Sequence, residues 1–367
     1  MSFAGSKVVE KIVEAGLHPP KMLTLMITST CNLQCRHCWL DCRPDNAAQA
    51  VKTETVHRVL REFGELGGQT VCLTGGEALI HPAWKDILSF ACSHCEFQQV
   101  RFQTNATLLT AGDVAFLASL DHPELTIQVS LDGATAATHD HVRGAGSFER
   151  SMRGLSRLGE AGLGARILVA FTEMTHNLKE LPELFERLDA MGVGRIVSGT
   201  LVLGGRAGKA VELAMPRPEQ YEELLQRYHQ DPQFKALYRK LGTISALEWY
   251  HGRSDGAAHR CSCIENPFIT ADGKMYPCVM LLCDDFAASG THDCSLADVV
   301  REMLPRWAEL PRIHRLRTER LLGCNGCVGR KHCAGGCMGR AYAGHGDLMT
   351  VEDRCALRKA VYSWQPP

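Results

Sequence analysis

The sequence predicts an α/β protein with a parallel sheet, followed by a small cysteine-rich region. Short β-rich runs alternate with helical patterns through the first half of the chain, and repeated units of this kind imply parallel strands with right-handed crossovers. Beyond about residue 260 cysteines dominate instead. The chain has 367 residues, 45% of them hydrophobic, which suits one large or two ordinary domains.

The strands and helices of the first half are expected from their apolar spacing. In the first helix Val56, Val59, Leu60 and Phe63 recur at helical spacing, and Gly67-Gly68 ends the pattern. The expected strands are 22–27, 70–74, 99–103, 125–130, 165–171 and 195–202. The expected helices are 53–67, 84–91, 110–119, 148–161 and 178–191.

Three cysteines follow the first expected strand directly, with the spacing C-x3-C-x2-C at Cys31, Cys35 and Cys38. Three thiolates on one loop can bind three irons of a [4Fe-4S] cube and leave the fourth iron without a protein ligand. The alternative is a structural zinc site with His37 as fourth ligand. Zinc sites usually combine two C-x2-C pairs, which this loop does not resemble.

Composition excludes some classes of partner and indicates the compartment in which the protein works. The net charge is -1 and no basic stripe is interleaved with aromatic residues, so nucleic acid is not an expected partner. No signal peptide and no run of ~20 apolar residues is present, so we expect a cytoplasmic protein without membrane contact. In a reducing cytosol, 17 cysteines indicate metal binding rather than disulfides. Oxygen-labile clusters would in turn imply function under anaerobic or low-oxygen conditions.

Polar and glycine residues follow several of the expected strands. Gly75-Gly76-Glu77 follows the second strand, Asn105 the third, and Ser130 and Asp132 the fourth. In parallel barrels the reactive groups lie at the carboxyl ends of the strands, so these residues are candidates for ligand binding. Each has an ordinary alternative, such as a turn residue or a solvated charge.

The second half contains a seven-cysteine pattern. Its members are Cys263, Cys278, Cys324, Cys327, Cys333, Cys337 and Cys355, with Gly273 between the first two. Two cubic clusters need eight ligands, so one ligand is missing from this set. Zinc remains the alternative metal here as well.

The cysteine loop, the Gly-Gly-Glu triplet and the stretch from Ser130 through Arg143 to Phe148 resemble the radical S-adenosylmethionine (SAM) superfamily. The seven-cysteine pattern resembles the SPASM domain that some of its members carry. The resemblance implies a partial (β/α)6 barrel of the TIM type followed by an iron-sulfur SPASM domain. The implied divisions are an N-terminal arm at 1–21, the barrel at 22–215, a helical linker at 216–258 and the SPASM domain at 259–367.

The resemblance also implies the cofactors, SAM and three [4Fe-4S] clusters. Gly75, Gly76 and Glu77 would bind the SAM amino group, Asn105, Ser130 and Asp132 would lie near its ribose or methionine part, and Arg143 would pair with its carboxylate. Cys31, Cys35 and Cys38 would hold the SAM-binding cluster. Cys324, Cys327, Cys333 and Cys355 would hold the outer auxiliary cluster, and Cys263, Cys278 and Cys337 the inner one. Cys261 is the first choice for the eighth ligand, and Cys283, Cys294 or an open iron are alternatives.

The activity that the resemblance implies is reductive cleavage of SAM to a 5'-deoxyadenosyl radical, which abstracts hydrogen from a peptide or protein side chain. The auxiliary clusters would transfer electrons, and flavodoxin or ferredoxin would be the electron donor. Only about 21 residues precede the first strand, so a peptide substrate is expected to need a separate recognition protein or direct binding. Val279 follows Cys278 where formylglycine-forming relatives usually have Asp, which disfavours that reaction.

The alternatives are an enzyme acting on a small molecule or tetrapyrrole side chain, and a non-enzymatic iron-sulfur or zinc protein. The sequence assigns no catalytic acid or base, no substrate identity and no oligomeric state. Cys42, Cys92 and Cys95 have no expected role.

Overall fold

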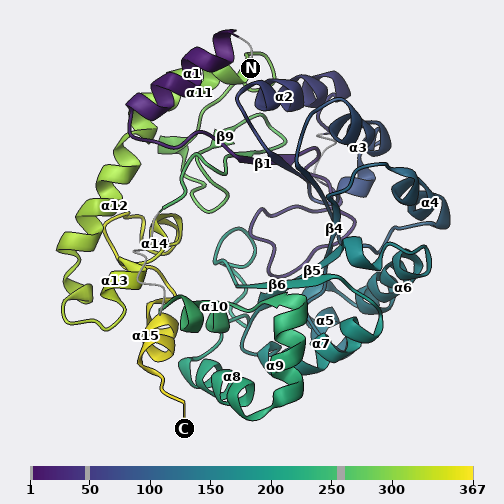
Figure 1. The fold of residues 1–367 in the computed structure, drawn as a ribbon, viewed down its shortest axis with the longest axis vertical. Helices are drawn as coiled ribbons and strands as arrows, with labels where there is room; N and C mark the ends of the chain where they lie inside the picture. The colour runs from purple at the N-terminus through teal and green to yellow at the C-terminus, as the bar shows by residue number, and fades with distance from the viewer. Residues whose placement is uncertain (1–2, 46–49, 254–260, 367) are drawn as a thin grey trace.

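The computed structural model describes residues 3–45, 50–253 and 261–366. In these residues a curved nine-stranded sheet has the order β7-β6-β5-β4-β3-β2-β1-β8-β9, and every neighbouring pair is parallel except β8 and β9 (Figure 1). The strands are β1 (Met22–Met26), β2 (Thr70–Thr74), β3 (Gln99–Thr104), β4 (Leu125–Ser130), β5 (Ile167–Glu173), β6 (Arg195–Thr200), β7 (Gly242–Thr243), β8 (Phe268–Ile269) and β9 (Met275–Tyr276).

Helices surround the sheet on its outer side, and the helices of the second half close the remaining side of the ring (Figure 1). The α-helices are α1 (Phe3–Glu14), α2 (Thr53–Glu65), α3 (Trp84–Ser93), α4 (Ala111–Ser119), α5 (Ala136–Arg143), α6 (Ser147–Glu160), α7 (Leu181–Ala190), α8 (Pro218–Gln230), α9 (Pro232–Leu241), α10 (Ser245–Gly252), α11 (Leu296–Trp307), α12 (Glu309–Arg320), α13 (Arg330–Cys333), α14 (Met338–His345) and α15 (Cys355–Ser363). Short 3₁₀ turns are η1 (Ala78–Ile80), η2 (Gly164–Arg166), η3 (Leu178–Glu180), η4 (Asp284–Phe286) and η5 (Leu322–Cys324).

The expected α/β class and parallel sheet are confirmed, whereas the ends of most expected elements differ from the structure by one to three residues. The fifth strand begins at Ile167 rather than residue 165 because η2 occupies the residues before it. The sequence did not indicate α5, a short polar helix that begins after the capping residue Thr135. The Thr135 hydroxyl accepts a hydrogen bond from the backbone N–H of Thr138 and so stabilises the first turn.

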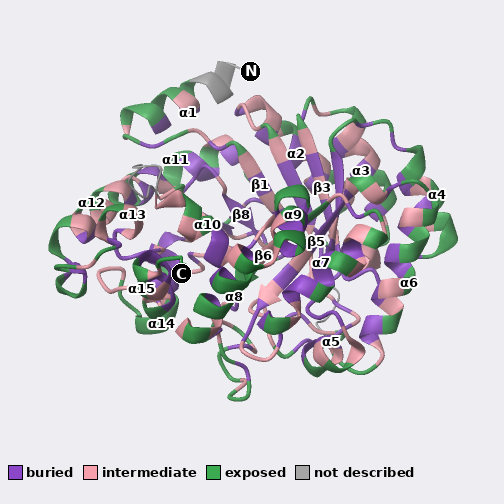
Figure 2. Cartoon of the chain, turned by 60° about the horizontal axis from the view of Figure 1, so that its bottom comes forward, coloured by how far each residue is buried: buried purple, intermediate pink, exposed green. Residues whose placement is uncertain are grey.

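Buried and partly exposed side chains alternate along β3, which shows which face of the sheet is directed to the cavity. In β3 the side chains of Val100, Phe102 and Thr104 are buried, whereas Gln99, Arg101 and Gln103 on the opposite face are partly exposed. The buried face packs against the surrounding helices, where Figure 2 shows the buried positions gathered along the strands. The other face is directed to the interior of the barrel, which is therefore lined partly by polar groups.

The second half of the chain contacts the barrel at both ends of the sheet. β8 pairs in parallel with β1, and α15 packs against α8 and α10. The Arg340 guanidinium, which is 3% exposed, donates hydrogen bonds to the carbonyls of Thr200 and Leu201 at the end of β6 and pairs with Asp353. The barrel sheet thus continues into the cysteine-rich region.

The predicted domain boundaries stay predictions, and the boundary at 258/259 lies outside the described residues. The expected arm at 1–21 contains α1, which packs against α11. Within residues 3–45, 50–253 and 261–366, no helix has the length and apolar character needed to cross a membrane.

Candidate active site

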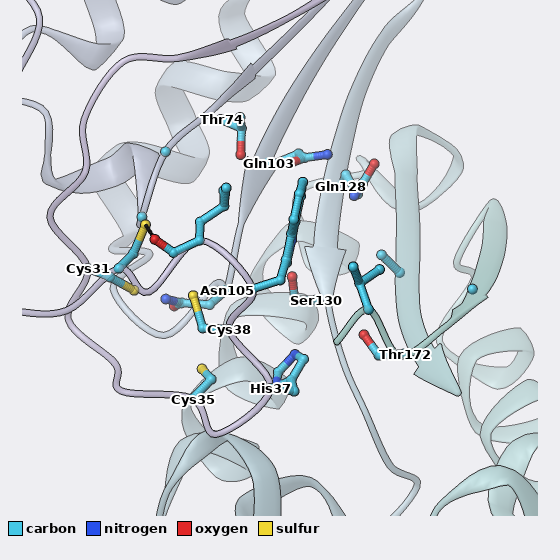
Figure 3. A pocket seen from close by; sticks show the side chains of 18 of the residues that line it. Cys31, Cys35, His37, Cys38, Thr74, Gln103, Asn105, Gln128, Ser130 and Thr172 are labelled. Atoms are coloured by element: carbon cyan, nitrogen blue, oxygen red, sulfur yellow. Dashed lines mark hydrogen bonds between the residues drawn. The ribbon is translucent and has the colours of Figure 1, made fainter. Parts of the chain in front are cut away.

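A cavity of about 530 Å³ lies at the carboxyl ends of the strands and reaches into the barrel. The cysteine loop after β1 supplies Cys31, Cys35 and Cys38 to its wall (Figure 3). The wall also contains the predicted residues Gly75, Gly76, Glu77, Asn105, Ser130 and Arg143. Residues that follow β2, β3 and β4 therefore converge on the three cysteines that follow β1, as the parallel topology requires.

The glycine pair after β2 allows close contact with the chain after β1. A Cβ atom on Gly75 would lie 2.8 Å from the Thr28 carbonyl oxygen, and one on Gly76 would lie 2.4 Å from the Thr30 carbonyl oxygen. The backbone N–H groups of Gly76 and Glu77 instead donate hydrogen bonds to these two carbonyls, at 2.8 and 2.9 Å. Only glycine permits this approach, which fixes the Gly-Gly-Glu segment against the residues between β1 and the cysteine loop.

The Glu77 carboxylate is buried and accepts three hydrogen bonds. Its donors are the Leu79 and Asn105 backbone N–H groups, at 3.1 and 2.7 Å, and the Thr104 hydroxyl at 2.7 Å. Burial raises the pKa of Glu77, and these hydrogen bonds oppose that effect. The Asn105 side-chain amide donates to Asn32 in the cysteine loop at 2.9 Å, so the ends of β2 and β3 are tied to the loop.

Asp132 lies behind the cavity wall. Its side chain is fully buried and is not among the cavity-lining groups, whereas Arg143 lines the cavity and pairs with it, Nε to Oδ2, at 2.6 Å. The Thr172 backbone N–H also donates to Asp132, at 2.7 Å. Burial raises the pKa of Asp132, but the charge of Arg143, together with the neighbouring histidines and the Thr172 hydrogen bond, outweighs burial and holds that pKa well below its usual range. Asp132 therefore holds Arg143 in position from behind the wall and does not itself face the cavity.

His37 contacts the same ion pair from the cysteine loop. Its Nε2 lies 3.3 Å from Asp132 Oδ2 and 3.4 Å from a terminal nitrogen of Arg143. Burial lowers the pKa of His37 to about 4, which leaves the imidazole neutral near pH 7. His37 therefore positions the pair without adding a charge.

Arg206, in the glycine-rich loop after β6, holds the cysteine loop from the other side. Its backbone N–H donates to the Cys38 carbonyl at 3.0 Å, and its guanidinium donates to the carbonyls of Cys35 and Cys42, at 3.0 and 2.6 Å. It also pairs with Asp41 at 2.7 Å. This glycine-rich loop therefore holds the cysteine loop in place through hydrogen bonds and an ion pair.

Several groups of the cavity were not assigned from the sequence. Arg101 and Gln128 line the interior, and alternate polar positions in the strands were the signal that could have found them. Val279 also lines the cavity and offers no titratable group. Cys42 lies beside Cys38, and a hydrogen bond from Cys42 lowers the pKa of Cys38 to about 6.

The predicted inner auxiliary cysteines gather in one place together with Cys261. The Cys261 and Cys263 thiols hydrogen-bond to each other. Burial, followed by the charges of Cys337 and Cys261, raises the pKa of Cys278 to about 12. Of the other two candidates for the eighth ligand, Cys294 is exposed and Cys283 interacts with Tyr342, so the geometry favours Cys261.

The predicted outer auxiliary cysteines line a second, small cavity. Its lining contains Cys324, Cys327, Cys333 and Cys355, with the cationic side chains Arg358 and Lys359 beside them. The fully buried Arg317 lies between the two thiol groups and donates to the carbonyls of Gly335 and Gly336. Four thiols with cations close by suit a cluster whose thiolates bring negative charge.

Comparison with known proteins decides the family. The family model described as "Radical SAM superfamily" matches residues 25–188. Mycofactocin maturase MftC of Mycolicibacterium smegmatis is 30% identical over 341 residues, which are 90% of this chain and 81% of that protein. The chain belongs to the radical SAM superfamily.

Two further comparisons cover more than nine tenths of this chain. The AdoMet-dependent heme synthase of Methanosarcina barkeri is 28% identical over 360 residues, 92% of this chain and 97% of that protein. The crystal structure of Streptococcus suis SuiB bound to S-adenosylmethionine superposes with a TM-score of 0.70 at 18% identity, over 95% of this chain and 80% of that one. That likeness shows the partial-barrel fold, and with the cysteine-rich region it supports an enzyme of the radical SAM/SPASM type.

The first cavity fits the cofactors of the superfamily, a [4Fe-4S] cluster and SAM. It presents three thiols on one loop, and the Leu33 backbone N–H is directed at the Cys31 sulfur, 3.5 Å away. Burial raises the pKa of Cys31 to about 12, so the thiolate is stabilised there only when a cation binds it. When bound, SAM supplies on one-electron reduction a 5'-deoxyadenosyl radical that abstracts hydrogen from a substrate. The chain's own residues in the cavity wall would bind and orient SAM.

Proposed function

We propose that this radical SAM/SPASM enzyme modifies a peptide or protein side chain by hydrogen abstraction, with two auxiliary clusters in electron transfer. One observation supports this most directly: the cavity that collects the three loop cysteines continues inward past Ser130 to Thr74, Gln103 and Gln128 (Figure 3). A substrate group can therefore reach the space next to SAM from inside the barrel. The likeness to mycofactocin maturase favours a peptide substrate.

The proposed residue roles follow the geometry. Cys31, Cys35 and Cys38 hold the SAM-binding cluster, Arg143 pairs with the SAM carboxylate, and Gly75, Gly76 and Glu77 receive the amino group. Asn105 and Ser130 contact the remainder of SAM, and Asp132 orients Arg143. Cys261, Cys263, Cys278 and Cys337 hold the inner auxiliary cluster, next to Val279 in the cavity wall, and the other four cysteines hold the outer one.

The proposed partners are an electron donor such as flavodoxin or ferredoxin and a separate protein that recognises the peptide. The second candidate substrate is a tetrapyrrole side chain. Its support is the heme synthase of Methanosarcina barkeri, of which this chain covers 97% at 28% identity.

Deuterium transfer separates the two substrates. Host cells are grown either with deuterated amino acids or with deuterated aminolevulinate, which labels tetrapyrroles, and their extracts are incubated anaerobically with reconstituted enzyme, SAM and dithionite. Deuterium in 5'-deoxyadenosine from the amino-acid-labelled extract alone supports a peptide or protein. Deuterium from the aminolevulinate-labelled extract alone would replace that substrate with a tetrapyrrole. The Cys35→Ala variant is the control and should form no 5'-deoxyadenosine.

A further inference from the structure

Arg101 is a cationic side chain in the interior wall of the cavity, and it forms no ion pair with a carboxylate among the described residues. It lies on the inward face of β3, two residues before Gln103 and four before Asn105. Because a strand rises about 3.3 Å per residue, Arg101 lies well below the strand end that contacts the cysteine loop. It is therefore on the substrate side of the cavity rather than beside the cluster.

The hydrogen-bonding capacity of Arg101 is largely unused. Within the described residues, one terminal nitrogen donates to Gln99 at 3.2 Å, and the Nε atom is shielded from solvent without any partner. A guanidinium has five N–H donors, and a shielded donor without a partner costs free energy. An acceptor from outside the chain would satisfy it.

The other charged side chains of this cavity wall already have an ion-pair partner or a full set of hydrogen bonds. Arg143 pairs with Asp132 and Arg206 with Asp41, whereas the buried Glu77 carboxylate is satisfied by its three hydrogen bonds. In the described part of the wall, Arg101 is thus the cation without a counter-charge. The occupant of this part of the cavity should supply one negative charge.

Amide groups extend the polar surface beside Arg101. Gln103 lies opposite Gln128 in the sheet, and both side chains line the cavity (Figure 3). Within the described residues, neither amide has a side-chain hydrogen-bond partner. One guanidinium beside two neutral amides matches a planar monoanion, to which arginine can bind through two parallel hydrogen bonds.

We propose that Arg101 binds a carboxylate of the substrate inside the barrel and so selects substrates that carry one. This inference deepens the proposed function and rests on it. The same chemistry would recognise the carboxylate of a peptide, at its C-terminus or on an acidic side chain, and a propionate of a tetrapyrrole.

Competitive binding to matched acid and neutral ligands tests the inference. Reconstituted enzyme loaded with SAM is dialysed against a mixture of short peptides, each present as free acid and as C-terminal amide, together with Asp/Asn and Glu/Gln peptide pairs and mesoporphyrin IX with its dimethyl ester. Mass spectrometry measures how much of each is retained. We expect at least one acid to bind about tenfold more tightly than its neutral counterpart, and we expect Arg101→Met to abolish that preference. Whether the preferred acid is a peptide or the porphyrin identifies the source of the carboxylate.

Two variants and one parallel assay make the outcome specific. Arg195→Met removes the same group from an exposed position outside the cavity wall and should keep the preference, and Arg101→Lys, which keeps the charge without the planar fork, should reduce it. No preference in the wild type, or a preference that survives in Arg101→Met, would overturn the inference. Dithionite-dependent cleavage of SAM is measured on the same samples, and its absence in the wild type would count against the proposed function instead.

Discussion

Asp132 supports the candidate site through its ion pair with Arg143, although Asp132 itself does not line the cavity. Asp132 is fully buried, and its carboxylate is committed to Arg143, His37 and the Thr172 backbone. Removing one member of such a pair leaves an uncompensated charge, which typically costs about 3–5 kcal/mol of stability. Stability and SAM binding should therefore respond differently to substitutions at the two positions.

We predict that Arg143→Ala weakens SAM binding at least about tenfold and lowers the thermal midpoint, with no loss of iron. In Arg143→Ala/Asp132→Asn the unpaired charge is gone, so the thermal midpoint should recover while the affinity stays low. Equilibrium binding of SAM to the reconstituted variants measures the first effect, and calorimetry the second. Unchanged affinity in Arg143→Ala would remove this residue from the SAM site.

Cys261 is the second residue whose role depends on its surroundings. It adjoins Cys263, Cys278 and Cys337 in space, and it was the first of several candidates for the eighth ligand in the sequence. We predict that Cys261→Ala loses up to about four irons per chain, because the inner cluster then lacks one of its four protein ligands. Cys294→Ala, at an exposed cysteine, should lose none. Equal iron contents in the two variants would exclude Cys261 as the eighth ligand.

At the scale of elements, the loop after β6 and the cysteine loop after β1 form one packed unit. Gly205 has a positive φ of 50°, and a Cβ on it would lie 2.7 Å from the Trp39 carbonyl oxygen and 2.8 Å from that of Cys38. Arg206 follows it and hydrogen-bonds to the same loop. The backbone contact at Gly205 thus sets where the cysteine loop lies.

We predict that Gly205→Ala displaces the cysteine loop and makes the SAM-binding cluster easier to remove. The variant should lose iron to a chelator several-fold faster than the wild type and form less 5'-deoxyadenosine. Gly208→Ala is the matched control, since its Cβ would meet nothing closer than 3.8 Å. If both glycine variants retain iron as the wild type does, the loop contact has no role in holding the cluster.

The elements that the sequence predicted best are those with a strong local pattern. β2 and β4 occupy the expected residues because their apolar runs are bounded by glycine and polar residues. The helical spacing of α2 predicts its start at Thr53 correctly, although the helix ends at Glu65 rather than residue 67. The pairing of β8 with β1 had no such signal, because β8 has only two residues, too few for periodicity, and β1 is far away in the sequence. The position of Asp132 behind Arg143 likewise depends on β5, which supplies the Thr172 N–H.

At the scale of the whole molecule, the two halves of the chain share the sheet and the catalytic cavity. Phe268 in β8 and Val279 beyond β9 belong to the cavity wall together with the residues after β1 to β4. The inner thiol group therefore adjoins the cavity, and the outer group lies beyond Arg317. Clusters bound to these two thiol groups would lie in series from the cavity outward, as an electron relay requires.

The most direct test of the account is the iron content and SAM chemistry of the anaerobically reconstituted protein. We predict about twelve irons per chain in the wild type, about eight in Cys31→Ala/Cys35→Ala/Cys38→Ala, and 5'-deoxyadenosine from SAM and dithionite in the wild type alone. Stoichiometric zinc with no cleavage of SAM would contradict it, because the cysteines would then be structural ligands and the cavity would hold no redox centre.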